Sequence, residues 1–443
     1  MAGSRGQKLL LRGSVLALAC ALGFAAPSAC SNSEDAPLAR RPMAEAGPFE
    51  ASPEPASPAS AGAAGSSDTP SEGGADLGVA APVRLGIAPL TDASEGGADS
   101  DSTLAELTVL SAGSRARSLS VRFDQLLDAS GNPSDSVFAG LAQTAALYRA
   151  HSAALLFSIA IVDRTEDARP PALRASWSST QLRSAIRAVV DRVYVTFGQE
   201  LAYLSFGTDV DRFLSLAGPN ERLSAAAFMY QALNYAKAHA QRLPSTQVGV
   251  TFSAPGVIAG LPPEANALLL GSDAAIITDY ALDASFQAKS LTDALADLAT
   301  LDSTLKDQPI VLQELAYPSS PLVQSSPEQQ EQFYDHVFAL LAARRQRFPF
   351  VDIYALTDDT DADALQRALT FGMLTGGSDA GGNANANADA SASAELSAAT
   401  AAFSSFGLTA REPNVPGAQG APNTTAKPAW LSALRALSEF ESP

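Results

Sequence analysis

The sequence is short of cysteine, histidine and basic residues, and each shortage removes a class of function. Its 443 residues contain two cysteines, Cys20 and Cys30, and three histidines. These numbers exclude a disulfide scaffold and a Cys-ligated zinc or iron–sulfur site, and they leave little room for a His-rich metal site. Lysine and arginine total 29 against 47 acidic residues, a net charge of −18. Nucleic-acid binding needs a basic face, so we expect no nucleic-acid partner. From the few cysteines and histidines we expect no metal, and we also expect no cofactor.

Aromatic and charged residues are also scarce. Aromatics make up 7% and charged residues 17% of the chain, against roughly 25% charged residues in typical soluble domains. Hydrophobic residues still reach 46%, enough for a sizeable core. The length allows one large domain or up to three smaller ones. The surplus of Ala, Ser, Gly and Pro indicates unstructured segments beside that core.

The N-terminus has the pattern of an export signal. Basic residues up to Arg12 precede the apolar run 13–26, which is too short to span a bilayer as a helix. Small residues then lead to Cys30, and this junction resembles a bacterial lipobox. We predict a lipoprotein signal peptide over 1–29 with lipidation at Cys30, and Cys20 as the rival site. Ordinary secretion is the alternative. The predicted location is the cell envelope, lipid-anchored at the outer membrane or cell surface.

Two segments are too poor in aliphatic residues to bury a core. Residues 30–81 consist mainly of Pro, Ala, Ser, Gly and acidic residues, and 376–394 repeat Asn and Ala. Such compositions do not offset the entropy of ordering the chain. We predict a disordered tether over 30–81 and a low-complexity insertion at 376–394 within the folded domain.

From residue 82 onward, short apolar runs alternate with helical patterns. Each run is apolar throughout, which is typical of buried parallel strands. The eight runs are 83–88, 118–123, 154–162, 201–206, 247–252, 274–278, 309–313 and 350–356.

Helical patterns fill most of the intervals between these runs. Residues 181–195 and 291–305 carry apolar side chains at helical spacing, and Ser326 with Pro327 begins a third helix as a capping box. Eight strands alternating with helices predict an α/β fold, a (β/α)8 TIM barrel over 82–440. A doubly wound sheet is the alternative.

Two acidic residues stand at strand ends, where the chemistry of such barrels is located. Asp209 follows the fourth run and Glu314 follows the seventh. Paired carboxylates that flank a sugar bond are the requirement of a retaining glycosidase, one as proton donor and one as nucleophile. Acidic residues are also common at the rims of barrels in acidic proteins, so spacing alone leaves both interpretations open.

The sequence around Glu314 is more specific. Residues 309–320 resemble the motif that ends strand seven in clan A retaining glycoside hydrolases, in particular bacterial endo-β-1,4-galactanase-like enzymes. The resemblance extends from about residue 83 to 440 and includes Lys427 to Trp430 at the start of the last helix. It implies Glu314 as the nucleophile and Asp209 as the acid/base, although the family has Glu at the latter position.

The resemblance also implies a set of substrate-binding positions, several of which depart from the family. Thr208 stands where an Asn is usual and Asp279 where a Tyr is usual, and common Trp platforms are missing at strand ends. Sugar rings stack on aromatic faces, so each lost platform removes binding area. The candidate substrate-binding residues are Thr208, Asp279, Tyr280, Tyr317, Arg122 and Asp358.

Two hypotheses follow. The protein is a surface-anchored retaining β-glycosidase with a weakened acid/base, or a catalytically degenerate barrel that binds a glycan or another partner without hydrolysis. Shortening Glu to Asp withdraws the acid by roughly 1.5 Å, and such displacements cost about a hundredfold in rate. We expect carbohydrate as the ligand, membrane contact through the lipid anchor only, and a monomer.

Overall fold

The computed structural model describes residues 83–89, 100–240, 243, 245–359, 361–370, 386–411 and 424–441. All of them belong to one unit of the chain, Ala75–Pro443. The predicted signal peptide, Cys30 and the tether to residue 81 lie outside the described residues. In the part of the chain that the structure covers, no helix is long and apolar enough to cross a membrane.

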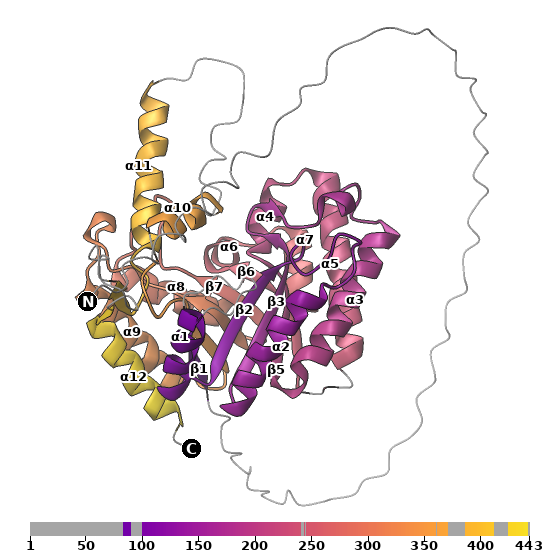
Figure 1. The fold of residues 1–443 in the computed structure, drawn as a ribbon. Helices are drawn as coiled ribbons and strands as arrows, with labels where there is room; N and C mark the ends of the chain where they lie inside the picture. The colour runs from indigo at the N-terminus through magenta and orange to yellow at the C-terminus, as the bar shows by residue number, and fades with distance from the viewer. Residues whose placement is uncertain are drawn as a thin grey trace, which may run out of the picture. The chain divides into compact units, whose positions relative to one another are not determined.

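Eight parallel strands form a closed barrel (Figure 1). In ring order they run β2, β1, β9, β8, β7, β6, β5 and β3, and the pairing of β2 with β3 closes the ring. Closure confirms the TIM barrel over the doubly wound sheet, which has free edges. The strands are β1 Arg84–Ile87, β2 Ala116–Arg122, β3 Ala154–Asp163, β5 Leu201–Thr208, β6 Gln247–Ser253, β7 Ala275–Asp279, β8 Ile310–Leu315 and β9 Phe350–Ile353. Each overlaps one of the eight apolar runs, with ends that differ by up to three residues.

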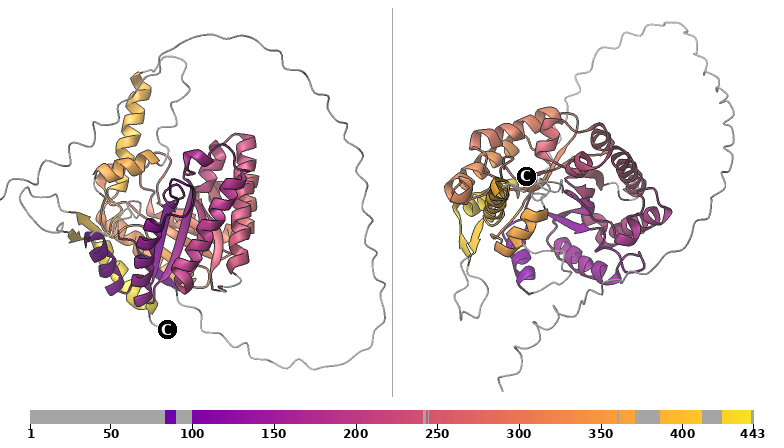
Figure 2. Two further views of the ribbon diagram at one scale, coloured as in Figure 1. Left: turned by 45° about the vertical axis from the view of Figure 1, so that its right-hand side comes forward. Right: turned by 90° about the horizontal axis from the view of Figure 1, so that it is seen from above.

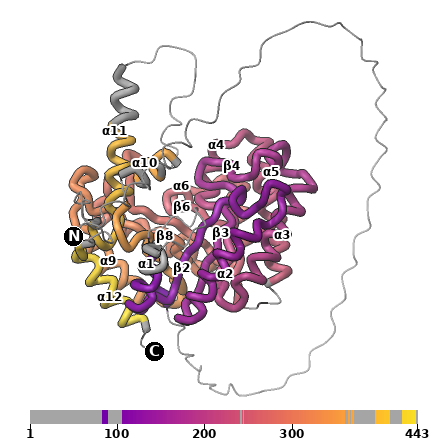
Figure 3. The backbone as a smooth tube through the Cα atoms, in the orientation of Figure 1, coloured from indigo at the N-terminus to yellow at the C-terminus, as the bar shows by residue number. Residues whose placement is uncertain are grey.

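Helices surround the barrel (Figure 2, right). They are α1 Ser100–Ser111, α2 Asp135–Ala150, α3 Thr180–Phe197, α4 Val210–Leu216, α5 Pro219–Ala240, α6 Ala254–Ala259, α7 Pro263–Gly271, α8 Leu291–Thr304, α9 Pro327–Ala343, α10 Asp361–Thr370, α11 Ala386–Phe403 and α12 Pro428–Glu441. The chain passes once around the barrel, strand by strand (Figure 3). Local signals set the helix ends: the Ser326 hydroxyl accepts from Gln329 N at the start of α9, and Gly198 ends α3.

The barrel interior changes character along its axis. One end is filled by an apolar cluster that includes Leu156, Tyr203 and Phe350. Farther along the strands, hydroxyl and amide groups meet instead: Thr251 Oγ1 lies 2.5 Å from Ser205 Oγ and donates to Gln313 Oε1 at 2.7 Å. Bulky aliphatic residues usually fill such interiors. The carboxyl end of this barrel is therefore polar before the site itself begins.

An insertion follows β9 and precedes α12. It contains α10, α11 and a two-stranded sheet of β10 Thr409–Arg411 and β11 Thr424–Ala426. The sequence predicted a disordered tract over 376–394, but from Ala386 onward the chain is helical. Alanine has the highest helix propensity, and its small side chain suits the close packing of α10 against α11. Residues 376–385 lie outside the described residues.

A short hairpin is added to the barrel beside β3. Its second strand, β4 Glu166–Asp167, pairs antiparallel with the end of β3. The turn of this hairpin contains Arg164, whose φ of 58° is in the left-handed region. The hairpin thus carries charged residues from the third strand over the mouth of the barrel.

Candidate active site

The two predicted carboxylates lie at the same end of the barrel. Asp209 follows the last residue of β5, and Glu314 is the penultimate residue of β8. Thr278 of β7 connects them, because it is in register with Glu314 and its hydroxyl donates to Asp209 Oδ1. The carboxyl ends of β5, β7 and β8 therefore build one site, as the strand-end rule predicted.

Asp209 is withdrawn from solvent. Its side chain has no exposed area, and its backbone adopts a left-handed conformation with φ of 46°. Oδ1 accepts from Thr278, and Oδ2 lies 3.4 Å from Arg212 Nε on α4. Gly207 permits this turn, since its own φ is 74° and an added Cβ would lie 2.4 Å from Val210 Cγ2. Oδ1 of Asp209 is thus hydrogen-bonded, whereas the buried Oδ2 has an ion-pair contact with Arg212 but accepts no hydrogen bond within the described part of the chain.

Glu314 is held differently. Its side chain is 16% exposed, and its Oε2 accepts a hydrogen bond from the Tyr280 hydroxyl. Arg164 Nη2 lies 3.7 Å from the same oxygen and donates to the Tyr280 hydroxyl at 3.2 Å. Burial raises the pKa of Glu314 to about 7; the Arg164 guanidinium opposes this rise, and the charge of Asp209 adds to it.

Arg164 is a site residue that the sequence pattern did not single out. Its backbone N–H donates to Thr208 O at 2.8 Å, and its Nη1 lies 3.0 Å from Asp163 Oδ1. Burial lowers the pKa of Arg164, but the charges of Asp163, Glu314 and Asp209 outweigh burial and raise it above its usual value. The signal was present, because Asp163 and Arg164 stand at the end of the third run. A search for paired carboxylates at strand ends does not find Arg164, because it considers acidic residues only.

Four of the predicted substrate-binding residues are engaged with other protein groups. Thr208 is buried, with its hydroxyl 3.3 Å from Ser120 Oγ. Asp279 accepts from Ala281 N, and burial raises its pKa to about 6. Arg122 is partly exposed and pairs with Asp124, Asp163 and Glu166, and Asp358 pairs with Lys427. Of the four, Arg122 has the most accessible polar groups.

The two predicted tyrosine platforms are not platforms. Tyr280 is 6% exposed and packs against Tyr354, Phe403 and Phe406. Tyr317 is 1% exposed, stacks on Phe333 of α9 and donates to Lys289 O. Neither ring offers a face to a sugar, because neighbouring aromatic side chains cover it. The hydroxyl of Tyr280 nevertheless reaches the site through Glu314.

Ligand groups for a metal are absent from the described site. Among the residues that the structure describes, no group of three or more His, Cys, Asp or Glu side chains converges on a common point. The charged side chains around Glu314 instead pair with one another, as Arg164 does with Asp163. The arrangement suits acid–base and nucleophilic chemistry by carboxylates.

No protein-family model matches the sequence, and no curated protein resembles it in sequence. Solved structures of the same fold include glycoside hydrolases. A GH5_18 variant from Bifidobacterium longum subsp. longum, crystallised with Manβ1-4GlcNAc, aligns with a TM-score of 0.54 at 13% identity, covering 81% of this chain and 79% of that chain. A GH5_18 variant from Streptomyces cattleya, also with Manβ1-4GlcNAc, gives 0.52 at 12% identity over 81% of both chains.

An exo-β-1,4-mannosidase from Opitutaceae bacterium strain TAV5 gives a TM-score of 0.53 at 13% identity, covering 81% of this chain and 60% of that chain. Likeness at such low identity shows the fold alone. The fold that this chain shares with them is the (β/α)8 barrel.

Proposed function

We propose that the mouth of this barrel binds a β-linked carbohydrate and that Glu314 acts as the nucleophile of a retaining glycosidase. One observation carries the proposal. Glu314 is a partly exposed carboxylate at the carboxyl end of β8, fixed by the Tyr280 hydroxyl and close enough to Asp209 for their charges to interact. The fold that the protein shares with glycosidases supports the same function.

In this mechanism Glu314 bonds to the anomeric carbon while the glycosidic C–O bond breaks, and water then hydrolyses the glycosyl-enzyme. The leaving oxygen needs a proton, for which Asp209 is the candidate donor. That side chain is fully buried and paired with Thr278 and Arg212. A general acid must come within about 2.6–3.2 Å of the oxygen that it protonates. We therefore expect slow cleavage of natural glycosides. Activated aryl glycosides should be cleaved faster, because their aryloxide leaving group departs without a proton.

The test is a panel of aryl β-galactosides, β-glucosides and β-mannosides beside natural oligosaccharides. The natural arm includes β-1,4-galacto-oligosaccharides, for the resemblance at residues 309–320, and Manβ1-4GlcNAc, the ligand of two structures of the same fold. Glu314→Gln should abolish cleavage of every aryl glycoside. The matched control is Glu328→Gln, at an exposed glutamate in the first turn of α9, which should keep wild-type activity. Equal loss in both variants would contradict the assignment.

A second candidate function is glycan binding without hydrolysis. It is favoured by the complete burial of Asp209, by the hydrogen bond from Thr278 to Oδ1 and by the ion pair of Oδ2 with Arg212. Asp209→Glu combined with Thr208→Asn restores the residues that the resemblance leads one to expect. If the wild type cleaves nothing and the folded double variant gains nothing, the glycosidase proposal fails. The protein should then be tested on a glycan array for binding alone.

We also propose that Cys30 carries a lipid anchor that holds the barrel at the cell envelope, since small residues precede it after an apolar run. Cys30→Ser should lose incorporation of a labelled fatty acid and leave the membrane fraction. Cys20→Ser should change neither. The reverse result would move the anchor to Cys20.

A further inference from the structure

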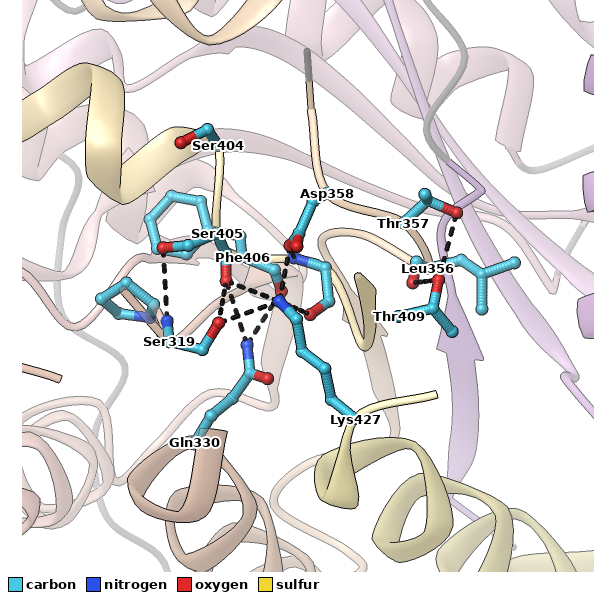
Figure 4. A network of polar contacts seen from close by, with 12 residues as sticks. Ser319, Gln330, Leu356, Thr357, Asp358, Ser404, Ser405, Phe406, Thr409 and Lys427 are labelled. Carbon is cyan, nitrogen blue, oxygen red and sulfur yellow. Dashed lines mark hydrogen bonds and ion pairs between the residues drawn. The ribbon is translucent and has the colours of Figure 1, made fainter. Parts of the chain in front are cut away.

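Lys427, immediately before α12, is buried in a cage of oxygen atoms that joins three segments of the chain (Figure 4). Its Nζ donates to Asp358 Oδ1 at 2.6 Å and to Ser319 Oγ at 2.8 Å, in the loops after β9 and β8. It also donates to the carbonyl oxygens of Ser405 at 3.2 Å and Gly407 at 2.8 Å. An ammonium group has three N–H donors, so these four oxygens use all of them. One side chain thus ties two strand-end loops and the segment after α11 to α12.

The segment 405–407 receives further contacts from helix α9 and from the loop after β9. Gln330 Nε2 donates to Phe406 O at 3.2 Å, and Gly407 N donates to Asp358 Oδ1 at 2.9 Å. Burial lowers the pKa of Lys427 and raises that of Asp358, and each charge opposes the shift of the other. Each of the two buried charges, Lys427 and Asp358, is therefore stabilised by the other. Removing one of them leaves the other as an uncompensated buried charge.

Phe406 of this segment, Phe403 at the end of α11 and Tyr354 after β9 pack around the ring of Tyr280. The Phe406 ring centroid lies 5.8 Å from that of Tyr280, and Phe403 lies 6.1 Å from it. Tyr354 completes the enclosure at 5.4 Å. The Tyr280 hydroxyl in turn donates to Glu314 Oε2. A continuous series of contacts therefore runs from Lys427, through residues 405–407 and the rings, to Glu314.

We propose that Lys427 is a positioning residue for Glu314. It fixes the backbone of residues 405–407 and thereby holds the Phe406 ring against Tyr280. The enclosed Tyr280 in turn keeps the Glu314 carboxylate in place and shielded from water. The proposal rests on the proposed function for the role of Glu314 as the reacting group. The insertion after β9, which α10 and α11 form, then acts as a part of the site and not as an appended element.

The experiment measures the accessibility of Glu314 without any sugar. The folded protein is coupled to glycine ethyl ester by a water-soluble carbodiimide, and labelling of Glu314 is followed by peptide mass spectrometry at one fixed pH. Asp352, which is 1% exposed in the barrel, serves as the internal reference for general loosening. Lys427→Met should increase the labelling rate of Glu314 several-fold and leave that of Asp352 unchanged. Lys237→Met, which breaks an ion pair of 2.5 Å with Asp273 away from the site, should change neither.

A second variant covers the case in which Lys427→Met does not fold. Phe406→Leu keeps the cage and an apolar side chain but removes the ring beside Tyr280, and it should also increase Glu314 labelling. Unchanged labelling in both variants, or equal gains at Asp352, overturns the proposal. An inactive wild type whose Asp209→Glu, Thr208→Asn double variant also gains no activity would overturn the proposed function and would leave the labelling result interpretable.

Discussion

Burial and two neighbouring charges act on the pKa of Glu314 in opposite directions. Burial raises its pKa to about 7, Arg164 opposes the rise from 3.7 Å, and Asp209 adds to it. A nucleophilic carboxylate must be ionised to attack, and the ionised fraction grows as pH rises through the pKa. The residue that we assign as the nucleophile is therefore only half ionised near neutral pH.

Inactivation by a 2-deoxy-2-fluoro aryl β-glycoside, which traps the glycosyl-enzyme, should consequently rise with pH. We expect half of the plateau rate near pH 7 and a rate about a hundredfold below the plateau at pH 5. The reason is that the ionised fraction of Glu314 falls about tenfold for each pH unit below its pKa. Stopped assays between roughly pH 4.5 and about pH 9 would measure the profile. A profile that is flat down to pH 5 would contradict the assignment.

Arg164 provides a second test at the same scale. Arg164→Gln removes the positive charge that favours ionised Glu314, so the midpoint of the inactivation profile should move upward by about one unit or more. Arg435→Gln is the matched control, since Arg435 pairs with Asp335 at 3.4 Å on the exposed surface. A downward shift, or an equal shift in the control, would show that Arg164 does not act on Glu314.

At the scale of elements, the junction between β1 and β2 depends on side chains. The two strands pair through Gly86 and Ala116. Asp352 of β9 reaches past β1, and its Oδ2 accepts from Ser118 N of β2 at 2.6 Å. This carboxylate therefore supplies an acceptor that the neighbouring strand does not provide.

Asp352→Ala should lower the free energy of unfolding by about 1–3 kcal/mol, because it leaves a buried N–H without a partner. Asp352→Asn keeps an acceptor oxygen and should cost less. Urea denaturation at pH 7 measures both. If alanine and asparagine prove equally harmful, the hydrogen bond to Ser118 is not what closes the junction.

The loop after α11 offers a prediction about close packing. A Cβ on Gly407 would lie 2.2 Å from both Thr357 C and Asp358 N, so Gly407→Ala must displace backbone. We expect a loss of roughly 1–3 kcal/mol in the free energy of unfolding. Gly218→Ala is the control, since nothing lies within 4 Å of its added Cβ. Similar stability of the two variants would mean that residues 405–407 can shift freely.

For the whole molecule, several buried carboxyl groups act on stability in the same direction. Burial raises the pKa of Glu314 and Asp352 to about 7, and that of Asp211 and Asp279 to about 6. Between the unfolded and folded pKa values the native state binds more protons than the unfolded chain, so stability falls as pH rises. The contribution of these groups is complete below about pH 4 and is lost by about pH 7.

The free energy of unfolding should therefore be higher at about pH 5 than at about pH 8. The net charge of −18 at pH 7 acts in the same sense through self-repulsion. Urea denaturation at constant salt measures the dependence, and Glu314→Gln should reduce its slope because that variant cannot ionise. Stability that increases from pH 5 to pH 8 would contradict the raised pKa values.

Local sequence patterns were enough to predict the eight parallel strands and the strand-end positions of Asp209 and Glu314. Eight apolar runs needed burial on both faces, and the helical patterns between them required crossover connections. A TIM barrel and a doubly wound sheet both meet these requirements, and the pairing of β2 with β3 decided for the barrel. Asp209 and Glu314 could be predicted at one mouth because parallel strands all end on the same side. These features depend on local periodicity, which a linear chain displays directly.

The surroundings of these two carboxylates, in contrast, depend on contacts between residues that lie far apart in the sequence. Tyr280 and Tyr317 are aromatic residues near strand ends, as sugar platforms are, but Phe406 and Phe333 cover their rings. Lys427 meets Ser319 across 108 positions of sequence, and Thr278 meets Asp209 across 69. The exposure, ion pairs and pKa of a site residue depend on which groups from distant parts of the sequence lie next to it. Local sequence patterns contain no information on these contacts. The burial of Asp209 and the partial exposure of Glu314 are consequences of the closed barrel and of the insertion packed on its mouth.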